Sequence, residues 1–522
     1  MPSNVVQQRL FPYDGTQDST KNPILISPKD IVYSNNIVYT TYSTKKKRPG
    51  LRYAFDIIKK TGDIVLAAHD FWRLGKQYVV IWDGKRIKAI DPTLDTIDDI
   101  SGDFELPTDE SVTFVPYQGV LIIFFGGNNT IPKYWDQTGS IQNLSATISL
   151  ASFGRVWFNR LIVPDPTVQG RLLLSQTGSP TAFTGGDSTT IDLDPNDGDP
   201  DGITAIFPPF FGSLYVAKRL SLYKITPVQI DATTIVFSRS KISDGIGCIS
   251  HNGVCAAENQ IFFPSDWGWH QFESTDKISE VDTSLLSREI QPIWREDTNF
   301  NSAKYIQSIY DRQLNSILCI FPSGSFTFPT DLWGFSLVAK KWYRWSDYNQ
   351  TAFCRYIDAE NKKLYTMVGS NKGELGLIDP DVKNDYGKKI SCFIQSGIIA
   401  PAGEPDDEFS FEQIAPIYVP QVTGSFSITM KIDGVTTFTQ EFDMEDTSLG
   451  DELGIDFITG QSILGGLPNV AMEKTRINGQ GMLYQLIIEH VQNDAEEDVD
   501  FELLGILFDM DRINKKTGKR VA

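Results

Sequence analysis

The sequence consists mainly of short apolar or alternating segments separated by Gly, Pro, Asn and Asp, a pattern typical of β-strands joined by turns. Long apolar stripes at helical spacing are absent from it. The clear apolar segments begin about 35 to 60 residues apart, at residues 77–81, 120–125, 155–163, 212–217, 260–263, 314–321 and 363–368. A second, aromatic-rich segment follows several of them, as at 133–136, 220–223, 267–270 and 341–345. This repetition predicts an inner strand, a hairpin and an outer strand in each of several four-stranded sheets around an axis.

We therefore predict an all-β fold with a β-propeller of six or seven blades over residues 50–385, because sheets repeated around an axis hide their edges. Two stacked sandwiches are the structural alternative. The Trp-Asp pairs at 82/83 and 135/136 do not indicate WD40 blades, since the Gly-His partner of each blade is missing.

The chain on either side of the propeller has a different texture. The extended, strand-like segments of residues 1–49 predict an N-terminal extended arm. Residues 386–522 predict a small C-terminal β-sandwich, with a hairpin of 425–430 and 435–440 around Asp433-Gly434. A second strand pair, 483–490 and 499–508, is expected before a basic tail made by Lys515, Lys516, Lys519 and Arg520.

Composition limits the classes of function. The 522 residues carry 47 Lys and Arg against 66 Asp and Glu, a formal charge of −19. That charge disfavours a protein that grips duplex DNA through its phosphates. The basic clusters at 45–48 and 515–520 are expected to be solvated or to meet an acidic partner subunit. Five scattered cysteines indicate a reduced protein made in a cytoplasm. Neither a secretory signal nor a membrane-length apolar run is present, so we expect a soluble protein with no membrane insertion.

Catalytic motifs are not evident, and we predict no enzymatic activity and no cofactor. The four histidines are isolated in sequence, and Gly-x-Ser-x-Gly, Walker and His-Glu-x-x-His motifs do not occur. Cys248, His251 and Cys255 have a spacing that could supply three zinc ligands, but a structural site needs four, so we favour two buried cysteines and a turn histidine.

A weak calcium candidate lies in the acidic segment 192–202. Asp197, Asp199, Asp201 and Gly202 fit the early positions of a Ca²⁺ loop. Pro208 stands where such a loop needs a bidentate Glu, which favours a solvated acidic turn.

Four ordered stretches carry a family resemblance. They are Ser27-Pro28-Lys29-Asp30 leading to Lys47-Arg48-Pro49-Gly50, the segment 153–161 followed by 174–176 and 179–180, the segments 201–206, 214–219 and 222–225, and the segments 243–248 and 261–268. In this order, over residues 27–380, the chain resembles the tail nozzle or tail hub proteins of short-tailed bacteriophages, which include tail tubular protein B-like and packaged-DNA-stabilising proteins. The motif positions are Arg48, Pro49, Gly50, Arg155, Arg160, Gly202, Lys218, Arg219 and Gly245.

The resemblance implies a structural virion protein of the tail, made in the host cytoplasm. It implies a ring of identical subunits, expected to be a hexamer, that attaches below the portal and its head-to-tail adaptor, retains packaged DNA and forms the channel for genome ejection. The implied partners are other copies of the chain, the adaptor, and a tail fibre or a tail plug or needle protein, with duplex DNA passing transiently and without specific binding. Two alternatives are a propeller glycan hydrolase and a host-receptor-binding tail protein.

Overall fold

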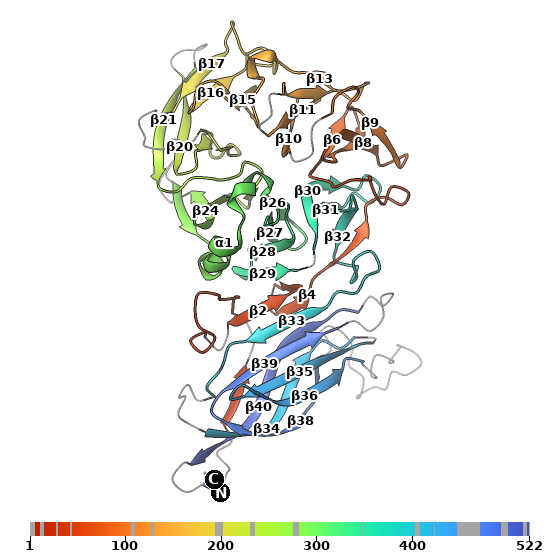
Figure 1. Ribbon diagram of the computed structural model, residues 1–522, viewed down its shortest axis with the longest axis vertical. Coiled ribbons are helices and arrows are strands. Elements are labelled where there is room, and N and C mark those ends of the chain that lie inside the picture. The colour runs from red at the N-terminus through yellow and green to blue at the C-terminus, as the bar shows by residue number, and fades with distance from the viewer. Residues whose placement is uncertain are drawn as a thin grey trace, which may run out of the picture. The chain divides into compact units, whose positions relative to one another are not determined.

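The computed structural model describes residues 6–10, 15–27, 30–41, 44–105, 110–126, 130–193, 202–229, 235–274, 281–346, 348–401, 408–421, 423–445, 470–491, 499–514 and 519–520. Strands dominate this part of the chain (Figure 1). The chain divides into two compact units. The propeller unit comprises residues 53–333 and 347–378, and the sandwich unit comprises residues 1–52, 334–346 and 379–522.

The predicted propeller is confirmed and has seven four-stranded antiparallel sheets among the described residues. The first strands of the sheets face a common centre and are β6 (Ala67–Arg73), β10 (Val112–Tyr117), β14 (Arg155–Trp157), β18 (Ala205–Ile206), β22 (Cys255–Ala257), β26 (Gln307–Asp311) and β30 (Gln350–Ile357). In Figure 1, β10, β26 and β30 surround this centre.

The remaining strands complete the sheets in sequence order. The first four sheets add β7 (Lys76–Trp82), β8 (Ile87–Asp91) and β9 (Thr96–Asp99); β11 (Val120–Phe125), β12 (Lys133–Trp135) and β13 (Gln142–Asn143); β15 (Arg160–Pro164), β16 (Arg171–Leu174) and β17 (Thr189–Asp192); and β19 (Leu214–Ala217), β20 (Ser221–Gln229) and β21 (Ile235–Asp244). The last three add β23 (Gln260–Ser265), β24 (Gly268–Ser274) and β25 (Val281–Leu285); β27 (Ser316–Phe321), β28 (Asp331–Ser336) and β29 (Lys341–Trp345); and β31 (Leu364–Ser370), β32 (Leu375–Asp379) and β5 (Gly50–Tyr53). In the division into two units, residues 50–52 of β5, residues 334–336 of β28 and all of β29 are grouped with the sandwich unit, although they belong to blades by strand pairing. Short helices lie between sheets: η1 (Ala146–Ile148), η2 (Arg288–Ile290), α1 (Gln291–Asp297) and η3 (Phe300–Tyr305).

Alternation along β11 shows why these segments are apolar throughout. Leu121, Ile123 and Phe125 pack into a cluster with the first sheet. Ile122 and Phe124, on the opposite face, pack into a cluster with the third sheet. Successive side chains of a strand point to opposite faces, and a blade has a neighbour on each side, so both sets must be hydrophobic.

The ring of blades closes within the propeller unit. Val79 and Ile81 of the first sheet share a hydrophobic cluster with Met367 and Leu377 of the seventh. The backbone N–H of Ile357 on β30 also donates to Oδ2 of Asp70 on β6 at 3.0 Å. The first and last blades are therefore joined by both apolar and polar contacts.

Two details of the strand prediction were wrong. The apolar segments predicted as inner strands are mostly second strands, such as β7, β11 and β23, because the first strands are shorter or more polar. Residues 155–163 form a hairpin instead of one strand: β14 and β15 pair across a turn in which Phe158 and Asn159 have φ of 48° and 54°.

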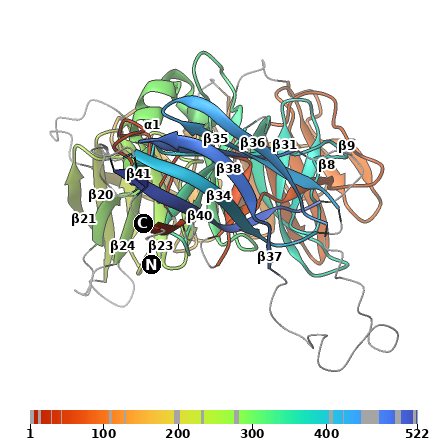
Figure 2. The ribbon, with the colours of Figure 1, turned by 90° about the horizontal axis from the view of Figure 1, so that it is seen from below.

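The sandwich unit contains two sheets among its described residues. One has eight strands: β1 (Val6–Leu10), β3 (Ile37–Tyr39), β4 (Lys45–Lys47), β34 (Glu408–Tyr418), β37 (Ala471–Met472), β38 (Thr475–Gly481), β40 (Glu502–Asn514) and β41 (Lys519–Arg520). The other has five, in the order β2 (Ile31–Asn35), β33 (Cys392–Ser396), β39 (Tyr484–His490), β35 (Ser425–Ile432) and β36 (Val435–Asp443). Figure 2 shows β34, β38 and β40 side by side.

Aromatic side chains join the two sheets of the sandwich. The ring of Tyr484 on β39 lies 5.6 Å from that of Phe411 on β34 and 5.3 Å from that of Phe508 on β40. The predicted hairpin at Asp433-Gly434 is present as β35 and β36. The other predicted strand pair is wrong, since 484–490 and 502–514 lie in opposite sheets. Residues before 50 supply strands to both sheets.

Candidate functional site

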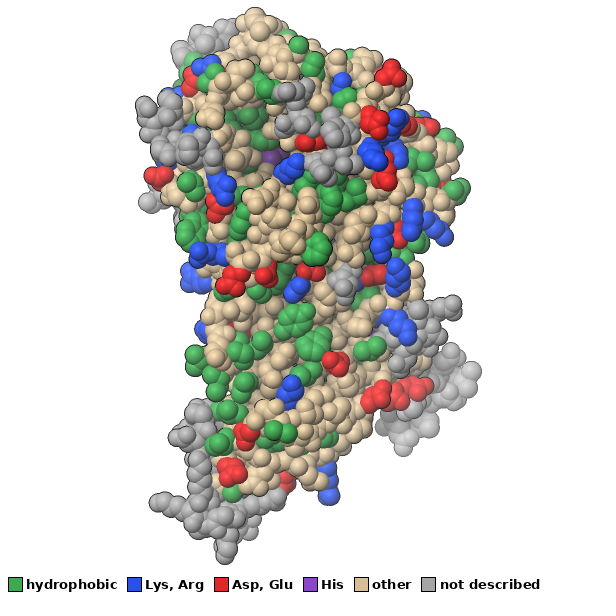
Figure 3. Space-filling model, viewed as in Figure 1, with side chains coloured by type: hydrophobic (Ala, Val, Ile, Leu, Met, Phe, Trp, Pro, Cys, Tyr) green, Lys and Arg blue, Asp and Glu red, His purple; other side chains and the backbone are tan. Residues whose placement is uncertain are grey.

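The main cavity of the propeller unit lies at the centre of its ring. Among the described residues it is lined by the first strands of all seven sheets or by residues next to them, and its volume is about 880 Å³. This volume falls in the range of about 300–1,000 Å³ that is usual for small-molecule sites. Figure 3 shows the hollowed face of the propeller, on which Lys and Arg side chains are interspersed with Asp and Glu.

The loop at residues 248–254 forms the floor of this cavity. Its Asn252 carbonyl accepts the Ser308 N–H of the sixth sheet at 3.1 Å. On the other side, Asn252 Nδ2 donates to the Val112 carbonyl at 3.3 Å, and Oδ1 accepts from Thr113 Oγ1 at 2.9 Å, both in the second sheet. The loop therefore crosses the ring at the N-terminal ends of the first strands.

The suggested zinc ligands belong to this region but are used separately. His251 Nδ1 accepts the Ile206 N–H at 3.2 Å, and its ring stacks on Phe153 at 4.5 Å. Burial, together with the nearby Arg155 charge, lowers the pKa of His251 well below its ordinary value, so the ring is neutral. Cys248 donates its thiol to the Ser250 carbonyl at 3.2 Å. Within the described residues, His, Cys, Asp and Glu nowhere gather in threes to hold a metal.

Three guanidinium groups line the cavity. Arg155 begins β14 and lies near the floor, where its Nε donates to the Ile206 carbonyl at 2.8 Å. Arg312 follows β26, and Arg355 lies near the end of β30, so both stand toward the other end of the first strands. The Arg355 guanidinium lies near Cys255 of the fifth sheet. Burial raises the pKa of the Cys255 thiol to about 12, and the charge of Arg355 opposes this rise.

Asp70 is the one carboxylate in the described lining. Its oxygens accept hydrogen bonds from the Ile357 N–H at 3.0 Å and from Gln77 Nε2 at 2.9 Å. Burial raises its pKa above the ordinary value. A glycan hydrolase needs a second carboxylate beside the first, and the described lining does not provide one.

The motif residues Arg48, Pro49 and Gly50 lie together in the sandwich unit. The Arg48 side chain is 2% exposed and pairs with both carboxylate oxygens of Asp385. Its Nε donates to Asn36 Oδ1 at 3.0 Å, and Nη1 to the Pro49 carbonyl at 3.0 Å. A Cβ on Gly50 would stand 2.1 Å from the Asn384 carbonyl oxygen, so the close backbone approach requires glycine.

The other motif residues tie consecutive blades or shape their turns. Arg155 joins the third sheet to the fourth through Ile206. Arg219 binds Asp266 of the fifth sheet through two hydrogen bonds of 2.9 and 3.0 Å. The Lys218 carbonyl accepts the Cys248 N–H at 3.0 Å, and its side chain is buried.

Within the third blade, Arg160 Nη2 donates to Asp187 Oδ2 at 2.8 Å and Nη1 to the Ser175 carbonyl at 3.0 Å. Gly245 has a φ of +85°, which glycine adopts without strain. A Cβ added at Gly202 would have no neighbouring heavy atom within 4 Å. Of the nine motif positions, Arg155 is the one that reaches the described lining of the central cavity.

The expectation that residues 45–48 form a solvated or partner-facing basic cluster was wrong. These residues include β4, which pairs with β3 and β40, so the alternating side chains of Lys45 and Lys47 point inward and are 2% and 1% exposed. Lys47 Nζ donates to the Val499 carbonyl at 2.8 Å, and burial lowers its pKa to about 8. Lys46, on the other face, pairs with Asp500 at 2.7 Å.

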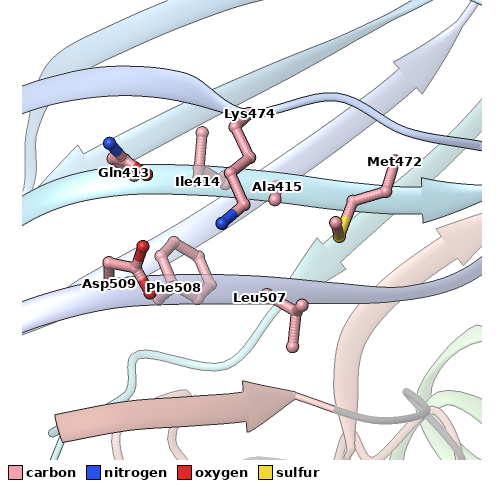
Figure 4. A pocket seen from close by; sticks show the side chains of 8 residues that line it. All are labelled: Gln413, Ile414, Ala415, Met472, Lys474, Leu507, Phe508 and Asp509. Atoms are coloured by element: carbon pink, nitrogen blue, oxygen red, sulfur yellow. The ribbon is translucent and has the colours of Figure 1, made fainter.

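The calcium candidates Asp197, Asp199 and Asp201 lie outside the described residues, as do Lys515 and Lys516 of the tail. A smaller pocket of about 200 Å³ occurs in the sandwich unit (Figure 4). There Lys474 extends across β34, with Phe508 and Asp509 on the neighbouring β40. Its volume is below the usual range for ligand sites.

No protein-family model and no curated protein matches the sequence. Similar solved structures include a chain of the mitotic checkpoint complex, at 9% identity and a TM-score of 0.37, covering 63% of this chain and 94% of that chain. The Cps50 (Swd1) β-propeller domain of Myceliophteria thermophila is 9% identical, with a TM-score of 0.39, covering 63% and 98%. PorZ of Porphyromonas gingivalis is 11% identical, with a TM-score of 0.35, covering 75% and 46%. In the described part of the chain, helices long and apolar enough to cross a membrane are absent.

Proposed function

We propose that this chain is a structural subunit of the tail nozzle of a short-tailed bacteriophage. The observation that carries the proposal is the placement of the resembling motifs on consecutive blades. Arg155 links the third blade to the fourth, while Lys218 and Arg219 link the fourth to the fifth. The motif residues thus maintain the order and spacing of blades, as expected of a family whose shared property is a rigid wall.

The central cavity supports a particular form of this proposal. The loop at 248–254 crosses the ring, and a cavity of about 880 Å³ has the size of a small-molecule site. A duplex therefore does not pass through a single propeller. The DNA channel of the proposed nozzle is formed between subunits, in a homo-oligomeric ring that we propose to be a hexamer.

In this function the ring attaches below the portal through the head-to-tail adaptor and carries a fibre, plug or needle protein at its far end. It retains the packaged genome and then lets it pass, without chemistry on the DNA. Its location is the virion tail, after synthesis in the host cytoplasm.

The test is electron microscopy of assembled particles that carry an epitope tag on this chain, labelled with gold-conjugated antibody. A matched preparation with the tag on a head protein is the control. We expect label at one vertex, below the portal. Label over the head, or at fibre tips alone, would contradict the proposal. Native mass spectrometry with the adaptor present gives a second readout, in which a chain that remains monomeric counts against a ring.

A further inference from the structure

We propose that the central cavity of the propeller binds a small polyanion, a molecule with two or more carboxylate or phosphate groups. This inference does not depend on the nozzle function. It rests on three arginines that line one cavity, on the absence of partners for two of their guanidinium groups among the described residues, and on the size of the cavity.

The charge of the lining is opposite to that of the chain. Three guanidinium groups, from Arg155, Arg312 and Arg355, face one carboxylate among the described lining residues. That carboxylate, on Asp70, is already bonded to a backbone N–H and to Gln77. The chain as a whole has a formal charge of −19. Clefts lined by one sign of charge focus the electrostatic potential, so this cavity attracts anions.

The guanidinium groups also have free donors. The guanidinium groups of Arg312 and Arg355 make no hydrogen bond or ion pair with the residues that the structure describes, and the guanidinium of Arg155 uses Nε alone, toward Ile206. Most other arginines of the propeller unit behave differently, as the pairs of Arg86 with Asp99 and of Arg219 with Asp266 show. Burial raises the pKa of Tyr310 in the lining, and the charges of Glu258 and Asp311 act in the same direction, so these two carboxylates lie near the cavity. Unpaired guanidinium groups present a planar fork that fits carboxylate and phosphate oxygens.

The remaining lining supports an anion over a cation or an apolar ligand. His251 is neutral, and its Nδ1 already accepts a hydrogen bond, so the ring proton is on Nε2. The volume of about 880 Å³ admits a small molecule with several anionic groups. The floor loop excludes a continuous duplex, which separates this ligand class from DNA.

The experiment is calorimetric titration of the full chain with tripolyphosphate and, in a parallel series, with citrate. The test variant is Arg312→Gln with Arg355→Gln, which removes two charges from the lining without removing a side-chain hydrogen bond or ion pair to the described residues. The matched control is Lys85→Gln with Lys372→Gln, two exposed lysines outside the lining, which changes the net charge equally.

We expect the wild-type chain to bind at least one of the two probes at one site per chain. The control should bind within twofold of wild type, and the cavity variant at least tenfold more weakly, since each lost guanidinium removes charge-assisted hydrogen bonds. Preference between the probes then distinguishes phosphate from carboxylate ligands. Absence of binding to wild type at millimolar probe, or equal weakening in both variants, would overturn the inference.

Discussion

Replacement of Arg48 by Met tests whether the motif arginine is a structural clamp. The side chain is 2% exposed and bonds Asp385 through two nitrogens, Asn36 Oδ1 at 3.0 Å and the Pro49 carbonyl at 3.0 Å. Its guanidinium also lies 5.5 Å from the centre of the Trp345 ring. Methionine keeps part of the apolar stem but none of these donors.

The magnitude follows from what is left behind. Removing one partner of a buried ion pair costs about 3–5 kcal/mol, because the other charge stays desolvated. The Asp385 side chain is 19% exposed, so water reaches it in part, and we take the lower value of about 3 kcal/mol. At about 1.4 kcal/mol per factor of ten, this is a change of roughly a hundredfold in the local opening equilibrium.

Hydrogen exchange followed by mass spectrometry measures that equilibrium where the contact lies. The N–H groups of Gly50 and Leu51 donate to the carbonyls of Val382 and Asn384 at 2.7 and 2.9 Å. Peptides that contain these amides should exchange about a hundredfold faster in Arg48→Met. The control is Lys474→Met in the same unit, where the lysine is exposed, so the substitution should change stability by less than about 0.5 kcal/mol. Exchange within threefold of wild type would refute the clamp.

Two further predictions concern stability. Gly247→Ala should destabilise the chain by about 1–3 kcal/mol, because the new Cβ would stand 2.0 Å from the Lys218 carbonyl oxygen. The control Gly202→Ala, where a Cβ has open space, should change stability by less than about 0.5 kcal/mol. The melting temperature of Gly247→Ala should therefore fall below that of Gly202→Ala, and equal melting temperatures would contradict the packing argument. Burial lowers the pKa of Lys47 from 10.5 to about 8, so the unfolded chain binds more protons between these values and stability should rise with pH across that window. The measurement is the unfolding free energy of wild type and of Lys47→Met at pH 7.5 and at pH 10.5. The difference, wild type minus variant, should increase by up to about 3 kcal/mol between these pH values. A difference that stays constant would show that Lys47 titrates normally.

Local periodicity predicts the blades because each blade is a local structure. β11 pairs with β12, the next strand in the sequence, and residues 121–125 of β11 are all hydrophobic because they pack alternately against two neighbouring blades. First strands such as β18, with two residues, are too short to leave a pattern. The sandwich is harder to predict from the sequence than the blades are. There β4 pairs with β40 across more than four hundred residues, and the sequence of one strand does not indicate its distant partner.

The basic segment at 45–48 shows how a charge count can mislead. Four consecutive cations favour a solvated surface. In a strand, however, alternate residues share a face, so Lys45 and Lys47 must point together. Buried hydrogen bonds then take the place of water, as between Lys47 and Val499. The cavity arginines could not be predicted either, because Arg312 and Arg355 are single residues of different blades that line one cavity only when the ring closes.

The distribution of charge bears on where DNA would run in the proposed nozzle. A duplex carries one negative charge per about 1.7 Å of its axis. It would be attracted by the cavity arginines, yet the loop at 248–254 closes that path. The acidic excess behind the net charge of −19 therefore lies outside the described cavity lining, which holds three arginines against Asp70. Repulsion between like charges acts over about 8 Å at physiological salt. A channel bounded by the outer surfaces of several subunits would thus meet DNA with an acidic average charge, and the duplex could slide without adhering, while the basic cavity of each propeller stays available to a small anion.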